Sequence, residues 1–488
     1  MKQSRIRTNF ILNLISQVLR IITPFITTPY VARVLGVDNV GIFSYSYSYQ
    51  SYFCLLAILG TAAYGSREIA RNRDSREQIS HTFWEIQSLR CITFLIALAG
   101  WFVLIYMQSE NQIIFVLLTT YVVAALFDIS WLYTGLEMFS YIVARTVLIR
   151  VLEVIAIFTL VKDSGDLPIY CIIMGGGMLV GNMSLWLNLR KYVDRVSMRS
   201  LHPFVHLKGT LVFFLPSIAT TMYTVLDKTL IGLITGSNYE NGIYEQASKV
   251  IEIAKAVTFT SLSTVLSPRS TYLYLHGEYE TIKKNLILSV DIMLTIGFGF
   301  VFGIMAVADR FVPVFFGPGY DGVVPLLRLL SPIIVVITIS AALGDQYYNP
   351  AGLRLKSAIF LLIGGFANLI LNLILIPLLK SSGAVIASVC AETLITTLYL
   401  VNCSGYLHLR QILNVAYRKI IAGAGMLAVI MISHRFIPDT ILGLLVMVAV
   451  GCISYLILLI VLKDSATHII LGELGKTAKK ITNKVRKK

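Results

Sequence analysis

Charged residues are scarce in this chain. Asp, Glu, Lys and Arg make up 14% of the 488 residues, hydrophobic residues make up 56%, and the mean hydropathy is +0.76. Soluble globular domains carry about 25% charged residues, so this composition excludes that class and predicts an integral membrane protein. The net charge of +15 gathers in short loops and in residues 463–488. That placement is typical of membrane topology and argues against nucleic acid as a partner.

Motifs for metal, disulfide and nucleotide chemistry are also missing. The six cysteines are scattered over apolar segments with no Cys-x-x-Cys pair, so we expect neither a disulfide nor a zinc site. His202 and His206 have a metal-binding spacing, but Pro203 intervenes and no third ligand is evident, so we expect a solvated loop. The glycine run at 175–181 lacks the Gly-Lys-Ser/Thr of a phosphate loop and indicates close helix packing instead. No small-residue cleavage site follows the first apolar run, so we expect that run to be retained.

Apolar windows of about 20 residues, each long enough to cross a bilayer, recur along the whole chain. We predict fourteen spans, at residues 10–35, 41–65, 82–106, 111–136, 142–161, 168–189, 209–235, 243–266, 285–308, 323–345, 356–378, 381–401, 417–434 and 440–461. Most of the 41 Lys and Arg residues fall in the two tails and in the loops after the even-numbered spans. This count places Arg145, Arg150, Arg418 and Lys419 with the loops, although they fall inside the limits of the windows at 142–161 and 417–434. The positive-inside rule therefore places both termini in the cytoplasm, and the short outward loops argue against a large catalytic domain there.

Two turn motifs recur after six spans. A glycine-bounded turn followed by Ile and an aromatic residue occurs at 36–43 and again at 236–244, with its second glycines, Gly41 and Gly242, 201 positions apart. Gly36 opens the first copy. A second match, Asp-x6-Gly-Leu, is offset by 217 positions and pairs Asp128 and Gly135 with Asp345 and Gly352. A displacement by an even number of spans preserves orientation, so the pattern predicts a parallel repeat.

The repeat predicts an all-α architecture of two bundles around a central cavity. We place the six-helix bundles at residues 1–208 and 209–403, two appended spans at 404–462 and a basic cytoplasmic tail at 463–488. Pro24 and Pro216 lie near the start of the two lead spans. They indicate kinks of the kind used for gating, although membrane helices also tolerate proline without a gating role.

Several of these segments resemble one transporter family. Residues 29–43 (PYVARVLGVDNVGIF) and 64–71 (YGSREIAR) resemble the opening of the polysaccharide-transport flippases of O-antigen, capsule and exopolysaccharide pathways. Residues 316–332 and 344–352 are similar to patterns in the second half of these proteins. The family belongs to the multidrug/oligosaccharidyl-lipid/polysaccharide exporter superfamily, and the likeness covers nearly the whole chain.

The resemblance implies a fold like that of the multidrug and toxic-compound extrusion (MATE) transporters, with about fourteen transmembrane helices. It implies a flippase, not an enzyme, that moves an undecaprenyl-pyrophosphate-linked oligosaccharide from the inner to the outer leaflet of a bacterial plasma membrane. A cationic cavity, alternating access and a role in cell-surface polysaccharide biosynthesis follow from the same likeness. We expect the lipid-linked oligosaccharide, the bilayer and other polysaccharide-assembly membrane proteins as partners. No cofactor is expected, and coupling to a proton or sodium gradient is left open.

Charged residues inside the predicted spans are the candidate binding residues. A charge at bilayer depth costs from about 3 to over 10 kcal/mol unless it meets a polar interior or a partner. By depth, the candidates for binding the pyrophosphate are Arg20, Arg90, Lys249 and Lys255. Arg33, Lys228 and Arg328 lie near the outer interface, where we expect their side chains to snorkel.

Other in-span residues leave two interpretations open. Glu245, Lys249, Glu252 and Lys255 share one helix face and would either meet the substrate or pair with one another. Candidates for ion coupling or for counter-ions are Glu153, Glu252 and Asp291, whereas we expect structural roles for Asp128, Asp227 and Asp345. Tyrosines that either stack on sugars or form an interfacial belt are Tyr45, Tyr47, Tyr49, Tyr52 and Tyr64.

Two rival functions remain on the sequence alone. A multidrug or organic-ion antiporter of the same superfamily would need a cavity that accepts organic cations, which Arg and Lys would repel. An integral-membrane polysaccharide polymerase would need a long outward loop or an acidic catalytic pair, and neither is evident.

Overall fold

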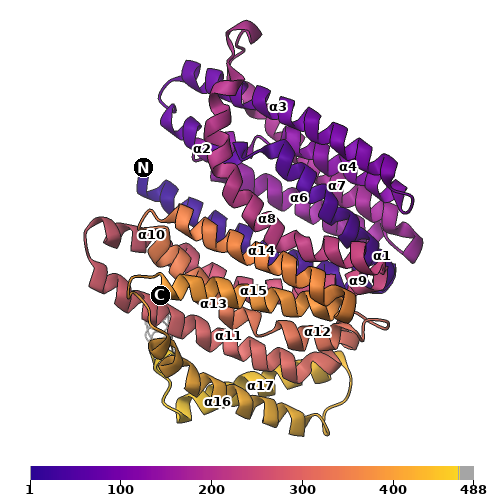
Figure 1. The fold of residues 1–488 in the computed structure, drawn as a ribbon, viewed down its shortest axis with the longest axis vertical. Helices are drawn as coiled ribbons and strands as arrows, with labels where there is room; N and C mark the ends of the chain where they lie inside the picture. Colours follow the sequence, from indigo (N-terminus) through magenta and orange to yellow (C-terminus); the bar gives the residue numbers. More distant parts are fainter. Residues whose placement is uncertain (1, 471, 473–488) are drawn as a thin grey trace, which may run out of the picture. The chain divides into compact units, whose positions relative to one another are not determined.

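The computed structural model is all-helical over the residues that it describes, which are 2–470 and 472 (Figure 1). For 2–21, 216, 219, 220, 222, 223, 260, 261, 264 and 265 only the backbone is described. Within the described part of the chain, nine helical segments are long and apolar enough to cross a membrane. The protein is therefore a multi-pass membrane protein, as its composition predicts, while the count of fourteen spans stays a prediction.

The chain divides into two compact units, Met1–Glu245 and Gln246–Lys488. The division falls inside one helix, α9 (Asn238–Lys255). We call them unit 1 and unit 2 and describe each by itself. The predicted partition at residues 208, 403 and 462 stays a prediction.

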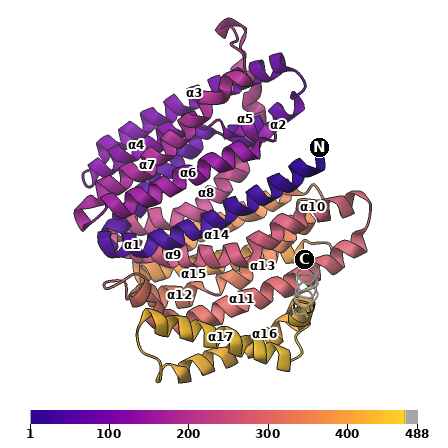
Figure 2. The ribbon, with the colours of Figure 1, turned by 180° about the vertical axis from the view of Figure 1, so that it is seen from behind.

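Unit 1 is built around a long, broken helix. Its elements are α1 (Lys2–Ile58), α2 (Thr61–Arg71), α3 (Arg76–Met107), α4 (Gln112–Phe127), α5 (Ser130–Gly135), α6 (Phe139–Leu160), α7 (Leu167–Ser184), α8 (Leu207–Thr235) and the start of α9. Helices α4 and α7 lie side by side (Figure 2). The core that they share with α1 and α3 is rich in aromatic residues, including the buried Trp101, Phe115 and Tyr121.

Helix α1 contains the first two predicted spans and breaks at the first repeat motif. Gly36 has φ 79° and ψ 168°, inside an otherwise helical segment. Gly236 ends α8 with φ 60°. Both turns use the left-handed region that glycine adopts without steric cost. Both motifs thus place their first glycine at positive φ, but the ψ values of 168° at Gly36 and 12° at Gly236 show that the two turns differ in backbone geometry. Pro24 lies inside α1 without breaking it, and the side chains of Arg20 and Pro216 lie outside the described residues.

Two predicted spans in unit 1 contain a break in the helix, and one of them is wrong in extent. Within the window at 41–65 the helix ends at Ile58, because Leu59 and Gly60 take positive φ values and the chain turns into α2. The window at 111–136 agrees with the candidate span Gln112–Gly135, although within it α4 ends at Phe127 and α5 begins only at Ser130. Hydropathy is continuous through both breaks, so it cannot report a change in backbone direction.

Unit 2 continues from α9 through a π-helical turn, Ala256–Thr260. Its other elements are α10 (Ser261–Leu275), α11 (Tyr279–Phe315), α12 (Val323–Leu330), α13 (Ile333–Leu343), a second π-helical turn (Gly344–Tyr348), α14 (Arg354–Leu379), α15 (Ser381–Val401), α16 (Leu409–Ser433) and α17 (Ile441–Val461). Helices α16 and α17, drawn in yellow, pack on each other and on α11 (Figure 1). A cluster that includes Met426, Met447 and Tyr455 fills their contact.

Four cations assigned to loops lie inside helices instead. Arg145 and Arg150 belong to α6, and Arg418 and Lys419 belong to α16, which begins eight residues before the predicted window. The windows at 142–161 and 417–434 already include these positions, so the count of loop cations is wrong here rather than the windows. These four positions are corrections to the predicted topology.

The second repeat is real, but its register differs from the predicted one. In unit 1, Met138 N donates to Tyr133 O across 2.8 Å, and Glu137 takes φ 60°. In unit 2, Leu353 N donates to Tyr348 O across 2.8 Å, and Gly352 takes φ 73°. The equivalent backbone positions are thus 215 apart, not the predicted 217. Gly135 itself is helical and packs against α2, where a Cβ would meet Ser66 O and Ile69.

Candidate functional site

The broken end of α4 is held by side chains from neighbouring helices. The last carbonyls of a helix have no partner within it. Four side chains of α3, α7 and the following 3-10 turn each donate to one of them: Asn182 to Ala124 O, Gln87 to Leu126 O, Trp186 to Phe127 O and Arg90 to Asp128 O. The break near Asp128 is therefore a helix end capped by side chains of its neighbours.

Arg90 is completely buried at this helix end. Its Nη1 donates to Asp128 O, and its Nε and Nη2 have no partner among the described residues. The Asp128 carboxylate accepts from Ser130 N across 3.0 Å, which starts α5. A cation beside the C-terminal carbonyls of a helix is stabilised by their partial negative charge. Arg90 thus has a clear structural role, and its predicted contact with substrate stays a proposal.

The charged stripe predicted on one face of α9 consists of pairs. At its start, in unit 1, Glu245 Oε2 lies 2.6 Å from Lys228 Nζ and accepts from Ser44 Oγ across 2.7 Å. At its end, in unit 2, Lys255 Nζ lies 3.0 Å from the exposed Glu252. Lys228 thus has a carboxylate at hydrogen-bond distance, and its predicted position near the outer interface stays a prediction. Lys249 is half-buried and also has a partner.

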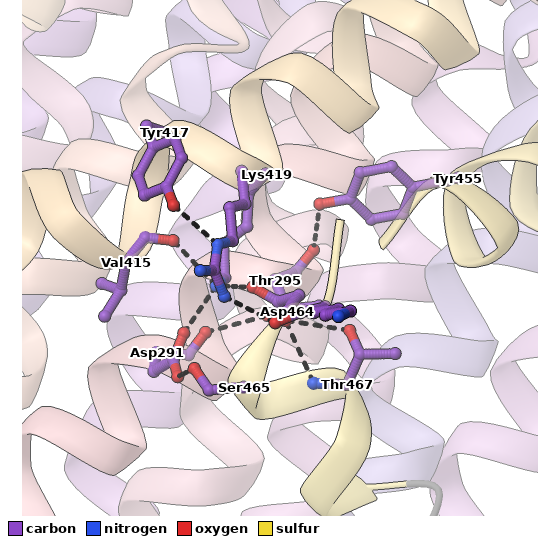
Figure 3. A network of polar contacts seen from close by, with 11 residues as sticks. Asp291, Thr295, Val415, Tyr417, Lys419, Tyr455, Asp464, Ser465 and Thr467 are labelled. Carbon is purple, nitrogen blue, oxygen red and sulfur yellow. Dashed lines mark hydrogen bonds and ion pairs between the residues drawn. The ribbon is translucent and has the colours of Figure 1, made fainter. Parts of the chain in front are cut away.

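Asp291 takes part in a buried ion network at one end of unit 2 (Figure 3). Lys419 Nζ, with a fully buried side chain, lies 2.5 Å from Asp291 and 2.6 Å from Asp464. Ser465 Oγ donates to Asp291 across 2.6 Å, and Thr467 donates to Asp464 through both its N and its Oγ1. The network thus ties the segment after α17 to both α11 and α16.

Glu153 on α6 also has a cationic partner. Its Oε2 lies 2.7 Å from Nη1 of Arg150, and the glutamate is buried whereas the arginine is 47% exposed. Gly177 of α7 leaves room for this carboxylate, because a Cβ there would overlap it. Gly175 likewise accommodates Thr120 of α4. The glycine run therefore serves close helix packing, as predicted.

The glycines of the first repeat form reciprocal contacts within unit 1. A Cβ on Gly41 would overlap Asn238 O of α9, and a Cβ on Gly242 would overlap Val37 O of α1. Val37 and Asn238 are themselves 201 positions apart. The two turns thus pack against each other about a local twofold, and each needs a glycine to let the partner's backbone approach.

His206 is buried, so the prediction that it lies in a solvated loop is wrong. Its Nδ1 lies 2.9 Å from the Tyr64 hydroxyl, and its Nε2 lies 2.9 Å from Glu85 Oε2. His202 is exposed, and its backbone N donates to the same carboxylate. Among the described residues no group of three or more His, Cys, Asp or Glu side chains could hold a metal ion.

A family model described as polysaccharide biosynthesis protein matches residues 6–273. The chain belongs to this family. The match includes both copies of the first repeat motif and all four predicted binding residues, Arg20, Arg90, Lys249 and Lys255.

Similar proteins and solved structures extend the likeness over most of the chain. A protein of Escherichia coli (strain K12) described as "Putative O-antigen transporter" is 25% identical over 405 residues, covering 81% of this chain and 96% of that protein. The lipid II flippase MurJ in its inward closed conformation has a TM-score of 0.70 at 14% identity, over 94% and 99% of the two chains. An inward-facing MATE multidrug transporter gives 0.58 at 14%, over 84% and 96%. The fold is therefore MATE-like, as predicted.

The sequence did not predict the buried charged side chains Lys419 and Asp464. Lys419 carries a signal that could have revealed it, because it falls on the buried stripe of α16 formed by Ile412, Ala416, Ala422, Met426 and Ile430. A cation on an apolar stripe at helical spacing indicates a buried pair rather than a loop. Asp464 carries no such signal, since it lies just beyond the last apolar window.

Proposed function

We propose that this protein is a flippase for lipid-linked oligosaccharides in cell-surface polysaccharide biosynthesis. Its substrate would be an undecaprenyl-pyrophosphate-linked oligosaccharide, moved from the inner to the outer leaflet of a bacterial plasma membrane. Membership of the polysaccharide biosynthesis family carries the proposal, and similarity to an O-antigen transporter over most of both chains supports it.

Cations inside membrane helices support an anionic substrate. Arg145 and Arg150 of α6 and Lys228 of α8 add to the predicted Arg90 in unit 1. A pyrophosphate needs several fixed positive charges in surroundings of low dielectric. In our proposal Arg20 and Arg90 from the first half, with Lys249 and Lys255 from the second, bind the head group while the polyprenyl tail stays in lipid.

Transport in this proposal breaks and forms no covalent bond. The protein is thus not an enzyme and needs no cofactor beyond a gradient of protons or sodium ions. Glu153, Glu252 and Asp291 are the carboxylates proposed to exchange such an ion or to balance the cations. Both termini would lie in the cytoplasm, which a reporter fused to each end of the full chain can test.

Reconstitution into vesicles tests the function directly. The vesicles contain a fluorescent undecaprenyl-pyrophosphate-linked oligosaccharide in both leaflets and are exposed to a membrane-impermeant sugar oxidant. We expect the protected inner-leaflet fraction to disappear with the protein and to persist in protein-free vesicles. Persistent protection with active, correctly inserted protein would contradict the proposal. Export of an organic dye cation by the same vesicles would favour the multidrug alternative.

The assigned cations have their own test. We expect Arg20→Ala and Lys255→Ala each to leave the protein in the membrane but to stop polymer export, with oligosaccharide-lipid accumulating on the inside. Normal export by the double variant would remove these two residues from the binding role. The flippase assignment itself would then still depend on the vesicle assay.

A further inference from the structure

The structure separates the five tyrosines in and beside the second half of α1. Tyr45 and Tyr49 pack on Phe115 in the core of unit 1, and their hydroxyls lie 3.2 Å apart. The hydroxyl of Tyr52 shares a hydrogen bond with that of Thr229, and the hydroxyl of Tyr64 shares one with His206. Tyr47 alone among the five is exposed, at 36%. Four of the five tyrosines are therefore held by contacts within unit 1.

Tyr47 belongs to an aromatic group drawn from three helices. Its ring stacks on Phe43 at 5.6 Å between centroids and meets Tyr121 of α4 edge-on at 5.4 Å. Phe43 in turn meets Tyr170 of α7 edge-on at 5.0 Å. Tyr121 and Tyr170 are buried. The buried rings thus fix the orientation of Tyr47 and leave one part of it open.

Ion pairs flank this aromatic group. Ser44, one turn before Tyr47 on α1, donates to Glu245 across 2.7 Å. Glu153 packs on Gly177 of α7, two residues after Gly175, where an added Cβ would lie 3.1 Å from Tyr121. The pairs are Lys228 with Glu245 at 2.6 Å and Arg150 with Glu153 at 2.7 Å. Each pair joins one buried carboxylate to a cation with an exposed part. The two cations are thus partly exposed near the aromatic group, at 21% for Lys228 and 47% for Arg150.

This combination does not suit a lipid-facing surface. Tyr47 lies eleven residues beyond Gly36, or about 16 Å along the helix, which places it near the middle of a bilayer rather than in an interfacial belt. Charged groups at that depth are costly against lipid. An open tyrosine with two ion pairs around it is instead typical of a site that combines an apolar face with a few placed polar groups.

We infer that Tyr47, the aromatic residues that hold it, and the pairs Arg150–Glu153 and Lys228–Glu245 form a saccharide-binding subsite. A pyranose ring has an apolar C–H face that a tyrosine can cover and a rim of hydroxyls that donate and accept hydrogen bonds. The arginine and lysine supply donors to that rim, and the carboxylates supply acceptors. The subsite takes the sugars next to the pyrophosphate. This inference deepens the proposed function and depends on it for its place in transport.

Direct binding tests the subsite without transport. The detergent-purified full chain is titrated with two short probes, geranyl pyrophosphate and geranyl-pyrophosphate-linked N-acetylglucosaminyl-N-acetylglucosamine. We expect the sugar-bearing probe to bind at least about fivefold more tightly. Tyr47→Ala should bring this ratio close to one without weakening geranyl pyrophosphate. Tyr47→Phe, which keeps the ring, should retain most of the ratio, and Arg150→Met should lower it in part.

A matched control removes an open tyrosine elsewhere in unit 1. Tyr106 at the end of α3 is 86% exposed, and Tyr106→Ala should leave both affinities unchanged. Equal binding of the two probes by the wild-type protein, or an unchanged ratio in Tyr47→Ala, would overturn the subsite. Failure of the vesicle assay with a normal probe ratio would overturn the flippase proposal and leave the subsite standing.

Discussion

Ser44 donates a hydrogen bond of 2.7 Å to Glu245, the residue 201 positions later that occupies the same place in the repeat. Two positions related by an internal repeat touch only where they lie beside its local twofold axis. The glycine contacts of Gly41 with Asn238 and of Gly242 with Val37 surround the same axis. The second copy thus has a glutamate where the first has a serine, and this glutamate pairs with Lys228.

Removal of Glu245 should destabilise unit 1. Glu245→Leu leaves Lys228 without its carboxylate in a mostly buried place, and we expect a loss of about 2 kcal/mol, measured by unfolding in detergent. Lys228→Met with Glu245→Leu should recover much of it, since no charge is left unpaired. Ser51→Ala is the control, because that hydroxyl bonds only the Tyr47 carbonyl of its own helix. Additive effects of the two charge substitutions would show that the pair is not coupled.

A methyl group at either glycine of the reciprocal contact should force α1 and α9 apart. We expect Gly41→Ala and Gly242→Ala each to cost about 2 kcal/mol or more, because the obstacle is a backbone carbonyl that cannot rotate away. Thermal unfolding in detergent measures this loss. Gly176→Ala is the control, as nothing lies within 4 Å of its added Cβ. Equal melting temperatures for all three variants would contradict the close approach.

Lys419 should be the most sensitive charge in unit 2. Lys419→Met leaves Asp291 and Asp464 buried without a cation, and we expect a loss of about 3 to 5 kcal/mol and a C-terminal segment that proteases cut more readily. The combination of Lys419→Met with Asp291→Asn and Asp464→Asn should restore part of it. Lys283→Met removes the lysine of an exposed pair with Glu280 and should change little. Wild-type protease resistance in Lys419→Met would show that the ion network does not hold the segment after α17 in place.

The two copies of the second turn have different residues, Glu137 and Gly352, at the position with positive φ. Substitutions at these two residues should therefore change the stability of the protein in opposite directions. Glu137 holds φ 60° at a cost that glycine avoids, so Glu137→Gly should be neutral or stabilising by up to about 1 kcal/mol. Gly352→Ala, at φ 73°, should destabilise by about 1 kcal/mol. Melting temperatures of the two variants test this. A drop for Glu137→Gly would show that its 3.3 Å contact with Arg73 outweighs the strain.

Local patterns predicted much of this molecule. The apolar windows predicted helices throughout, and some limits, such as those of the window at 381–401, coincide with α15 (Ser381–Val401). The repeated glycine turns were visible because a left-handed backbone position restricts the residue type at one site. The glycine run at 175–181 indicated helix packing for the same reason. The breaks at Leu59 and Asp128 were not predicted, since side chains from other helices stabilise them.

By itself, the sequence determined that the chain enters a membrane, that two turn motifs recur along it, and that charged residues fall within its apolar segments. Only the tertiary structure decided what those charges do. Lys419 meets Asp291 across 128 positions and Asp464 across 45, and Arg90 meets the end of a helix that begins beyond the next loop. Hydropathy averages polarity along one helix, whereas a buried charge is neutralised by a partner on another. The cost of burying an ion depends on that partner, and no pattern within a single helix contains it.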